Sequence, residues 1–319
     1  MRLIIDNKIT ILHRKIVNII EHPGYGTLHY EILPLLNYDV QEVILTDSLN
    51  EVFFNHFDYY VIHTTGHMYY IVSNLEYLLK NNVNVSLFFH VAPNYYKLKK
   101  KRTFLNYVKK LQKKYNLKCF CPSLNVSNKY CEIGIMTVSV QVGIPRIDNR
   151  ILAFNPNNSE YYNKIITTCT SSNSKYINIK GIDKFYKLMK KTNNLNNCMI
   201  LGFDGSYKGI LCKKFNNSDF LNILSHSSFF IQLSRTECYS VTQIQAKQLK
   251  IPLIVSDVDG NVDTVPNIYN RVDKFNKLVK EFDDKCDLAK TAIDYNYYSS
   301  LKNENIANFD KNLKRKVGI

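Results

Sequence analysis

The sequence predicts an α/β protein of two domains, each built around a parallel β-sheet. Short apolar runs typical of buried strands alternate with longer segments in which apolar residues recur at helical spacing. This alternation is typical of β-α-β crossovers in parallel sheets. The 319 residues suffice for two domains, and a segment rich in Pro and Asn, residues 143–158, separates the two halves. We therefore place the domain boundary near residue 155.

Composition narrows the class of protein. No apolar run reaches the roughly 18 residues of a transmembrane helix, so we expect no membrane span. Residues 1–17 lack the apolar segment and cleavage site of a signal peptide, so we expect a cytoplasmic protein. The closest of the eight cysteines, Cys119 and Cys121, form no C-x-x-C pair and have no nearby His at ligand spacing. We expect free thiols and no metal site.

The net charge of +15 indicates attraction to an anionic partner. Nucleic acid, acidic membrane lipid and a phosphorylated substrate all fit this charge, and so does a solvated lysine-rich surface without a partner. In the most basic segment, residues 97–118, an apolar stripe is formed by Leu105, Val108 and Leu111. This spacing predicts an amphipathic helix whose cationic face would meet an anionic membrane, a polyanionic acceptor or solvent.

In the N-terminal half, strand signals end at potential ligand-binding residues. The predicted strands span residues 8–12, 43–46, 59–63 and 83–89, with one or two more within 132–142. Gly24 and Gly26 follow the first strand and open a helical segment, where the backbone could approach a ligand closely. His63 and His90 end two later strands, and ligands collect at the carboxyl ends of parallel strands. A tight turn and ordinary hydrogen-bonding histidines are the alternatives.

The C-terminal half repeats the alternation of strands and helices. Strands are predicted at residues 165–169, 198–201, 229–233 and 253–255, and helices at 182–190, 215–225, 241–249, 273–282 and 286–292. Lys175 and Lys180 are expected on a loop before the first of these helices, and Pro252 ends the third.

The polar segment 234–240, between a predicted strand and a predicted helix, carries the strongest indication of a binding site. Glu237 precedes the helix, and Gln245 follows about two helical turns later. Free backbone N–H groups at the start of the helix would suit a diphosphate. These groups belong to Tyr239, Ser240 and Val241. An ordinary crossover, with Glu237 as a favourable charge near the helix start, is the alternative.

Two stretches of this half resemble the donor site of family-4 retaining nucleotide-sugar glycosyltransferases, which have the GT-B fold. Ser234-Arg-Thr-Glu-Cys-Tyr-Ser, then Gln245-Ala and IPLIVSDVDGNVD, resembles the family pattern S-x-x-E-G-F-G, a second Glu eight residues after the first, and S-D-x-G-G-x-x-E. Glu237 matches the first Glu, whereas Gln245 stands at the second. Lys180-Gly-Ile-Asp resembles the end of the family's G-R-x-x-x-x-K-G-x-D, with Lys175 where Arg is usual.

Two segments of the N-terminal half resemble the same family. VNVSLFFHVAP is similar to the segment whose His approaches the transferred sugar, which favours His90, with His63 and His67 as runners-up. Gly24-Tyr-Gly resembles the Gly-rich turn that faces the donor across the interdomain cleft.

The resemblance implies a GT-B architecture of two Rossmann-like domains with parallel sheets that face a central cleft. Residues 1–155 would bind the acceptor and residues 156–319 the nucleotide-sugar donor, with a terminal helix at 295–309 packing back on the first domain. It implies sugar transfer from a nucleotide-diphosphate donor, with UDP-sugar favoured, with retention of configuration and without a metal or other cofactor. The catalytic residues would be His90 and Glu237. The donor-binding residues would be Gly24, Gly26, Lys175, Lys180, Tyr239, Ser240, Val241 and Gln245.

Departures from the family pattern leave a second hypothesis. An amide at Gln245 accepts fewer hydrogen bonds than a carboxylate, which would lower donor affinity by roughly 1 to 2 kcal/mol. Lys175 lacks the bidentate fork of Arg. The chain could therefore be a non-catalytic, GT-B-like basic module that binds nucleic acid or a partner protein. No motif names the acceptor, so a glycan, a glycolipid, a protein, a modified DNA base and peripheral contact with the inner face of a membrane all stay open.

One motif also fits another class of enzyme. LIVSDVDGN resembles the aspartate loop of haloacid-dehalogenase-like phosphatases, in which Asp257 would be the nucleophile and Asp259 the acid/base, with magnesium. The stretch that follows Asp259 is too short for the rest of that fold.

Overall fold

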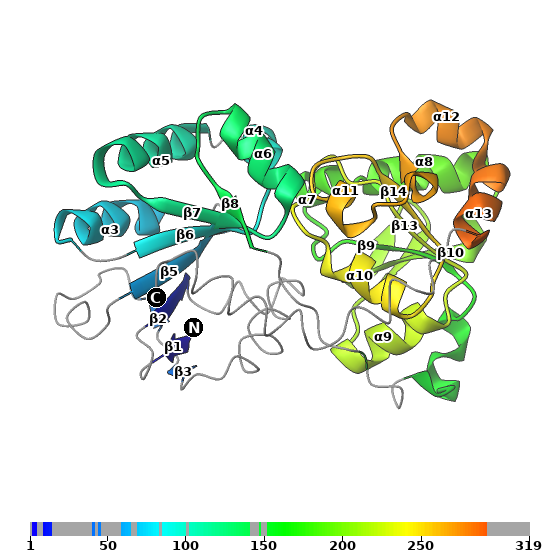
Figure 1. Ribbon diagram of the computed structural model, residues 1–319. Coiled ribbons are helices and arrows are strands. Elements are labelled where there is room, and N and C mark those ends of the chain that lie inside the picture. The colour runs from blue at the N-terminus through cyan, green and yellow to red at the C-terminus, as the bar shows by residue number, and fades with distance from the viewer. Residues whose placement is uncertain are drawn as a thin grey trace. The chain divides into compact units, whose positions relative to one another are not determined.

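The computed structural model describes residues 2–4, 9–14, 40–41, 44–45, 59–64, 69–82, 85–99, 102–140, 147 and 152–291 (Figure 1). The chain divides into two compact units, residues 1–143 with 304–319 (unit 1) and residues 144–303 (unit 2). The boundary near residue 155 stays a prediction. The terminal helix at 295–309 also stays a prediction, because residues 292–319 lie outside the described part. No helix within the described part is both long and apolar enough to cross a membrane.

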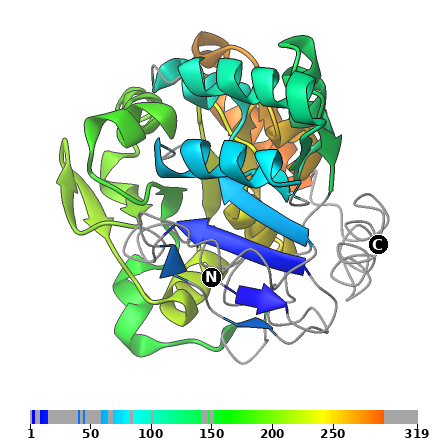
Figure 2. The ribbon, with the colours of Figure 1, turned by 90° about the vertical axis from the view of Figure 1, so that its left-hand side faces the viewer.

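Unit 1 contains an 8-stranded sheet in the order β3-β1-β2-β5-β6-β7-β8, with β4 paired to β2. Its strands are β1 (Arg2–Ile4), β2 (Ile9–Arg14), β3 (Val40–Gln41), β4 (Ile44–Leu45), β5 (Tyr59–Thr64), β6 (Val85–Phe89), β7 (Lys118–Cys121) and β8 (Val138–Ser139). β1 runs antiparallel to β2 and β3, whereas the other pairs are parallel. The helices are α3 (Tyr69–Lys80), α4 (Pro93–Leu98), α5 (Arg102–Tyr115) and α6 (Leu124–Glu132). α3 and α5 lie over one face of the sheet (Figure 2).

The basic segment of unit 1 forms two helices instead of the single predicted one. α4 ends at Leu98, and α5 begins at Arg102. The predicted apolar stripe is confirmed, because α5 buries Phe104, Leu105, Val108 and Leu111. Lys110, Lys113 and Lys114 are exposed on the same helix. The helix is therefore amphipathic, with its lysines toward solvent.

His90 directly follows strand β6, as predicted. Its ring centroid lies 5.0 Å from that of Phe88. Burial lowers the pKa of the His90 imidazole from 6.5 to about 3. The imidazole is therefore neutral at physiological pH.

Unit 2 contains a 7-stranded sheet in the order β11-β12-β10-β9-β13-β14-β15. Its strands are β9 (Ile165–Thr168), β10 (Cys198–Leu201), β11 (Gly205–Tyr207), β12 (Ile210–Lys213), β13 (Phe229–Gln232), β14 (Leu253–Ser256) and β15 (Arg271–Val272). The β11–β12 pair is antiparallel, and the other strand pairs of this sheet are parallel. The α-helices are α7 (Ser174–Ile179), α8 (Ile182–Lys191), α9 (Asn217–Ser225), α10 (Val241–Gln248), α11 (Asn261–Thr264), α12 (Phe275–Lys280) and α13 (Phe282–Thr291).

Both faces of the unit 2 sheet are buried. Successive residues of a strand point to opposite faces, so Ile165 belongs to one apolar cluster and Ile166 to the other. The first cluster includes Phe185 of α8, and the second includes Ala246 of α10. Burial on both faces explains why these strands are continuous apolar runs, and it is typical of doubly wound α/β domains.

The stretch expected to be a loop before residue 182 is instead a helix, α7. Asn173 caps it, because its side chain accepts a hydrogen bond from the backbone N–H of Lys175 at 2.9 Å. Gly181 joins α7 to α8 with a φ of +68°, in the left-handed region. A Cβ atom at Gly181 would lie 1.9 Å from the carbonyl oxygen of Leu233. Only glycine allows the α7–α8 junction to contact the end of β13 so closely.

We predict that Gly181→Ala destabilises the protein far more than Gly209→Ala. Both positions have positive φ values, but a Cβ at Gly209 meets no atom within 4 Å. Gly209→Ala should therefore cost only the left-handed strain, about 1 to 2 kcal/mol. Gly181→Ala adds a backbone clash, so its unfolding free energy in urea should fall by clearly more. Equal losses in the two variants would show that the close approach contributes nothing.

We also predict that His90 makes the protein acid-sensitive. The folded-state pKa of His90 lies below its ordinary value, so protonation favours the unfolded state and stability is lost as pH falls below about 6.5. Between pH 7 and pH 5 this loss should reach roughly 2 kcal/mol. Urea unfolding at both pH values should show a smaller loss for His90→Asn than for the wild type. The same loss in both proteins would contradict the assignment.

Candidate functional site

The polar segment 234–240, between β13 and α10, is held in place by glycines from two sides. On one side, Gly181 approaches the carbonyl oxygen of Leu233. On the other, the backbone N–H of Gly260 donates to the carbonyl oxygen of Glu237 at 2.9 Å. A Cβ at Gly260 would lie 1.6 Å from the carbonyl oxygen of Cys238. The segment therefore lies against the α7–α8 junction and against the turn that precedes α11.

Arg235 fixes the start of this segment to α7 and α8. Its guanidinium binds the Asp183 carboxylate through two hydrogen bonds of 2.7 and 2.6 Å, and it also contacts the carbonyl oxygen of Asn178. The backbone N–H of Arg235 donates to the carbonyl oxygen of Ile179 at 2.8 Å. Burial raises the pKa of Asp183, but the bonds from Arg235 outweigh it and the pKa is lowered. Asp183 thus serves to hold the loop.

The carboxylate of Glu237 is the centre of the site. Its Oε2 atom accepts from Lys180 Nζ at 2.7 Å, from Gln232 Nε2 at 2.8 Å and from Ser234 Oγ at 3.5 Å. The Glu237 side chain is 11% exposed and that of Lys180 is 26% exposed. Two residues that the sequence placed in separate motifs therefore form an ion pair at the edge of the buried interior.

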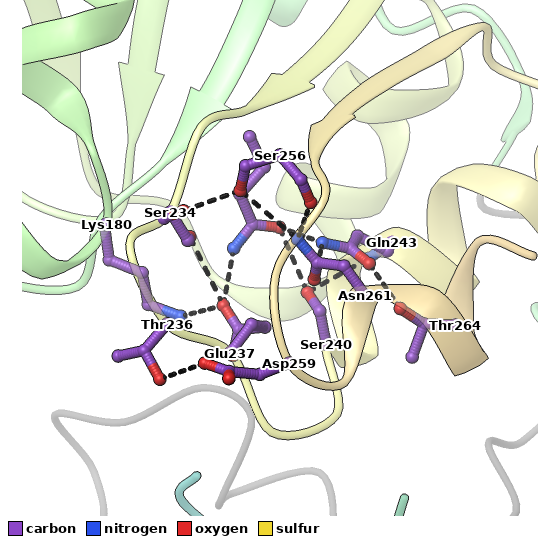
Figure 3. Close-up of polar contacts among 11 residues, drawn as sticks. Lys180, Ser234, Thr236, Glu237, Ser240, Gln243, Ser256, Asp259, Asn261 and Thr264 are labelled. Carbon is purple, nitrogen blue, oxygen red and sulfur yellow. Dashed lines mark hydrogen bonds and ion pairs between the residues drawn. The ribbon is translucent and has the colours of Figure 1, made fainter. Parts of the chain in front are cut away.

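Behind Glu237 lies a buried network of amides that sequence reasoning missed (Figure 3). Gln243 Nε2 donates to Gln232 Oε1 at 2.9 Å and to Asn261 Oδ1 at 2.8 Å. Thr264 Oγ1 donates to Gln243 Oε1 at 2.5 Å. The sequence offers one weak signal for this network. Gln232 stands at the end of an apolar strand, and Gln243 stands two residues before the expected Gln245.

The other predicted donor-binding residues of unit 2 lie around the start of α10 and on α7. Ser240 caps α10, and its Oγ accepts from the backbone N–H of Gln243. Within residues 152–291 no backbone carbonyl accepts from the N–H groups of Ser240 or Val241, as the helix start predicts. Tyr239 is half-buried, Gln245 is buried and Lys175 is exposed. A role for each of these residues in binding stays a prediction.

The aspartates of the phosphatase-like motif have protein partners. Asp257 Oδ1 lies 3.3 Å from Arg271 Nη1, and Asp259 Oδ2 accepts from Thr236 Oγ1 at 2.5 Å. No group of three His, Cys, Asp or Glu residues in the described part is arranged to hold a metal ion. Asp259 thus contacts the polar segment 234–240.

The remaining predicted residues belong to unit 1. His90 follows β6, and His63 lies in β5. Gly24, Gly26 and His67 lie outside the described residues. Their roles, including that of His90 in catalysis, stay predictions.

Comparisons with known proteins bear on the fold. No family model matches the chain, and no curated protein matches it in sequence. Among solved structures, a glycosyltransferase from Rickettsia africae is similar with a TM-score of 0.58 and 17% identity, and 96% of each chain is covered.

Two further solved structures are similar to this chain. A UDP-forming α,α-trehalose-phosphate synthase from Burkholderia xenovorans, solved with glucose-6-phosphate, has a TM-score of 0.59 and 10% identity over 92% of this chain and 75% of that chain. HepE from Anabaena, solved with UDP and glucose, has a TM-score of 0.55 and 10% identity over 82% and 78%. Together with the two Rossmann-like units, these likenesses show that the chain has the GT-B fold.

Proposed function

We propose that the protein is a glycosyltransferase that moves a sugar from a nucleoside-diphosphate donor to an acceptor with retention of configuration. The GT-B fold supports this class of reaction. The observation that carries the proposal is the ion pair between Lys180 and Glu237 at 2.7 Å. It joins the two sequence motifs that resemble a donor site, although they lie 57 residues apart.

The chemistry of this site suits a sugar diphosphate. Lys180 supplies a positive charge where negative charge develops on the leaving diphosphate, and the N–H groups of Ser240 and Val241 at the start of α10 add to it. Glu237 would accept hydrogen bonds from sugar hydroxyls. His90, whose imidazole is neutral, could donate or accept a hydrogen bond without adding charge. Lys180 would share its donors between Glu237 and the diphosphate.

UDP-sugar is the favoured donor, and the acceptor is a glycan, a glycolipid, a protein or a modified DNA base. Two of the similar structures are described as UDP-forming or as bound to UDP. The exposed lysines of α5 support a polyanionic acceptor or contact with an acidic membrane surface. We propose that no metal ion takes part in donor binding.

We predict that one nucleoside diphosphate raises the melting temperature and that this shift depends on Lys180. A ligand at 100 times its Kd stabilises the native state by about 2.7 kcal/mol, which corresponds to roughly 5 °C. UDP, GDP, ADP and their sugars should be compared with and without Mg²⁺ or Mn²⁺. Lys180→Ala should abolish the shift, because the leaving diphosphate loses its counter-charge.

Lys187→Ala is the matched control, since this lysine is exposed on the neighbouring helix α8. It should keep the full shift. If no nucleotide raises the melting temperature of the wild type, the assignment of the donor site is wrong, and the non-catalytic module becomes the better hypothesis. A shift that survives in Lys180→Ala would place the nucleotide elsewhere.

We further predict that Glu237→Gln lowers sugar transfer or donor hydrolysis by at least about 100-fold, a loss typical of a group that acts on the transition state. Binding of the nucleoside diphosphate alone should change little. Turnover of a panel of UDP-sugars measures this, and NMR of the product anomer tests retention. Glu281→Gln, an exposed carboxylate of the same unit, should leave turnover intact. Unchanged turnover in Glu237→Gln would remove Glu237 from the mechanism.

A further inference from the structure

The buried amides behind Glu237 form a hydrogen-bonded chain, from Gln232 back to the carbonyl of Ser256, that allows only one assignment of donors and acceptors. The chain starts at the backbone carbonyl of Ser256, which accepts from Asn261 Nδ2 at 2.8 Å. A carbonyl oxygen can only accept, so the NH₂ group of Asn261 must face it and Oδ1 must face Gln243. The NH₂ group of Gln243 therefore has to face Asn261.

The same NH₂ group sets the orientation of Gln232. Gln243 Nε2 uses one hydrogen for Asn261 Oδ1, at 2.8 Å, and the other for Gln232 Oε1, at 2.9 Å. Ser240 Oγ also donates to Gln232 Oε1 at 3.1 Å. With its oxygen held by these donors, Gln232 can only present its NH₂ group to Glu237, at 2.8 Å from Oε2.

Because these amides are buried, each of them can obtain its hydrogen-bond partners only from the other residues of the network. Gln243 and Asn261 are 0% exposed, and Gln232 is 1% exposed. Bulk water therefore cannot replace a lost donor, and a buried amide oxygen without a partner is costly. Removing the NH₂ group of Gln243 therefore takes a hydrogen-bond donor away from the Gln232 oxygen and alters how Gln232 is oriented.

At the far end, the two oxygens of Glu237 differ. Oε2 accepts from Lys180, Gln232 and Ser234. None of the residues described in the structure donates to Oε1. The carboxylate is thus held by one oxygen, and the other can accept a hydrogen bond from a ligand.

We propose that Gln243 is a positioning residue for Glu237, acting through Gln232, and that this leaves Oε1 as the acceptor for a donor-sugar hydroxyl. The inference rests on the proposed function and assigns a role within it to two glutamines that no motif identified. Gln243 touches neither the nucleotide nor the sugar in this scheme. Its effect should therefore appear in recognition of the sugar and not in recognition of the diphosphate.

The test compares the affinity for UDP with that for UDP-glucose, UDP-galactose and UDP-N-acetylglucosamine by calorimetry. Gln243→Met keeps the volume but removes both donors, so the ratio of Kd(UDP) to Kd of the tightest UDP-sugar should fall about tenfold, the loss of one charge-assisted hydrogen bond. Gln243→Glu should lower it further, because Gln232 must then turn its oxygen toward Glu237. Kd(UDP) itself should change less than about twofold.

This ratio separates positioning from loss of structure. A partly unfolded sample weakens both ligands by the same factor, which cancels in the ratio. Asn222→Leu and Asn222→Asp are matched controls, because Asn222 is another buried amide of unit 2, bonded to the carbonyl of Ala153. They should lower stability and leave the ratio unchanged. Should both Gln243 variants fail to fold, Gln232→Met removes the donor to Glu237 directly and should show the same fall.

Three results would overturn the proposal in distinguishable ways. An unchanged ratio in folded Gln243→Met, with UDP binding intact, overturns the role of Gln243 alone and leaves the proposed function standing. An equal fall in the Asn222 controls shows that any buried amide has this effect. If the wild type binds none of UDP, GDP, ADP and their sugars, both the proposed function and the role of Gln243 are wrong.

Discussion

The ion pair between Lys180 and Glu237 is the interaction on which the arrangement of the candidate site in unit 2 depends. Opposite charges this close to the interior lose hydration, so they need further hydrogen bonds and a fixed geometry. Gln232 and Ser234 supply the bonds to Glu237. The pair of Arg235 with Asp183 secures the geometry by tying the same loop to α7 and α8. The loop cannot move away without leaving a partly buried charge unpaired.

Close packing of backbone makes this arrangement possible. Gly181 and Gly260 each bring a turn so near the loop that a single methyl group would overlap a carbonyl oxygen. The amide network then fills the space between the loop and α10 with directional bonds. Apolar side chains would fill the same volume without setting the orientation of a carboxylate, which is the difference between a packed interior and a binding site.

Much of this could be predicted from the sequence where a signal is local. Apolar runs predicted β9, β10, β13 and β14 because both faces of the sheet are buried, and the resemblance brought Lys180 and Glu237 into one site. α7 was missed because its capping residue, Asn173, lies in a polar stretch of a kind that is also typical of loops. The hairpin of β11 and β12 was missed because its turn uses positive φ at Lys208 and Gly209. The partners of Gln243 are set by distant residues, so no local pattern shows them.

The two glycine contacts also constrain the order in which unit 2 folds. Gly181 and Gly260 lie on opposite sides of the loop in the chain, so the loop reaches its final form only after the crossovers before and after it have packed. Contacts between such distant segments form late, because the intervening chain must first lose its entropy. The site is therefore complete only when the whole stretch from residue 181 to residue 260 has folded. A molecule that binds only the folded site would stabilise the folded state of unit 2 and protect it from proteolysis.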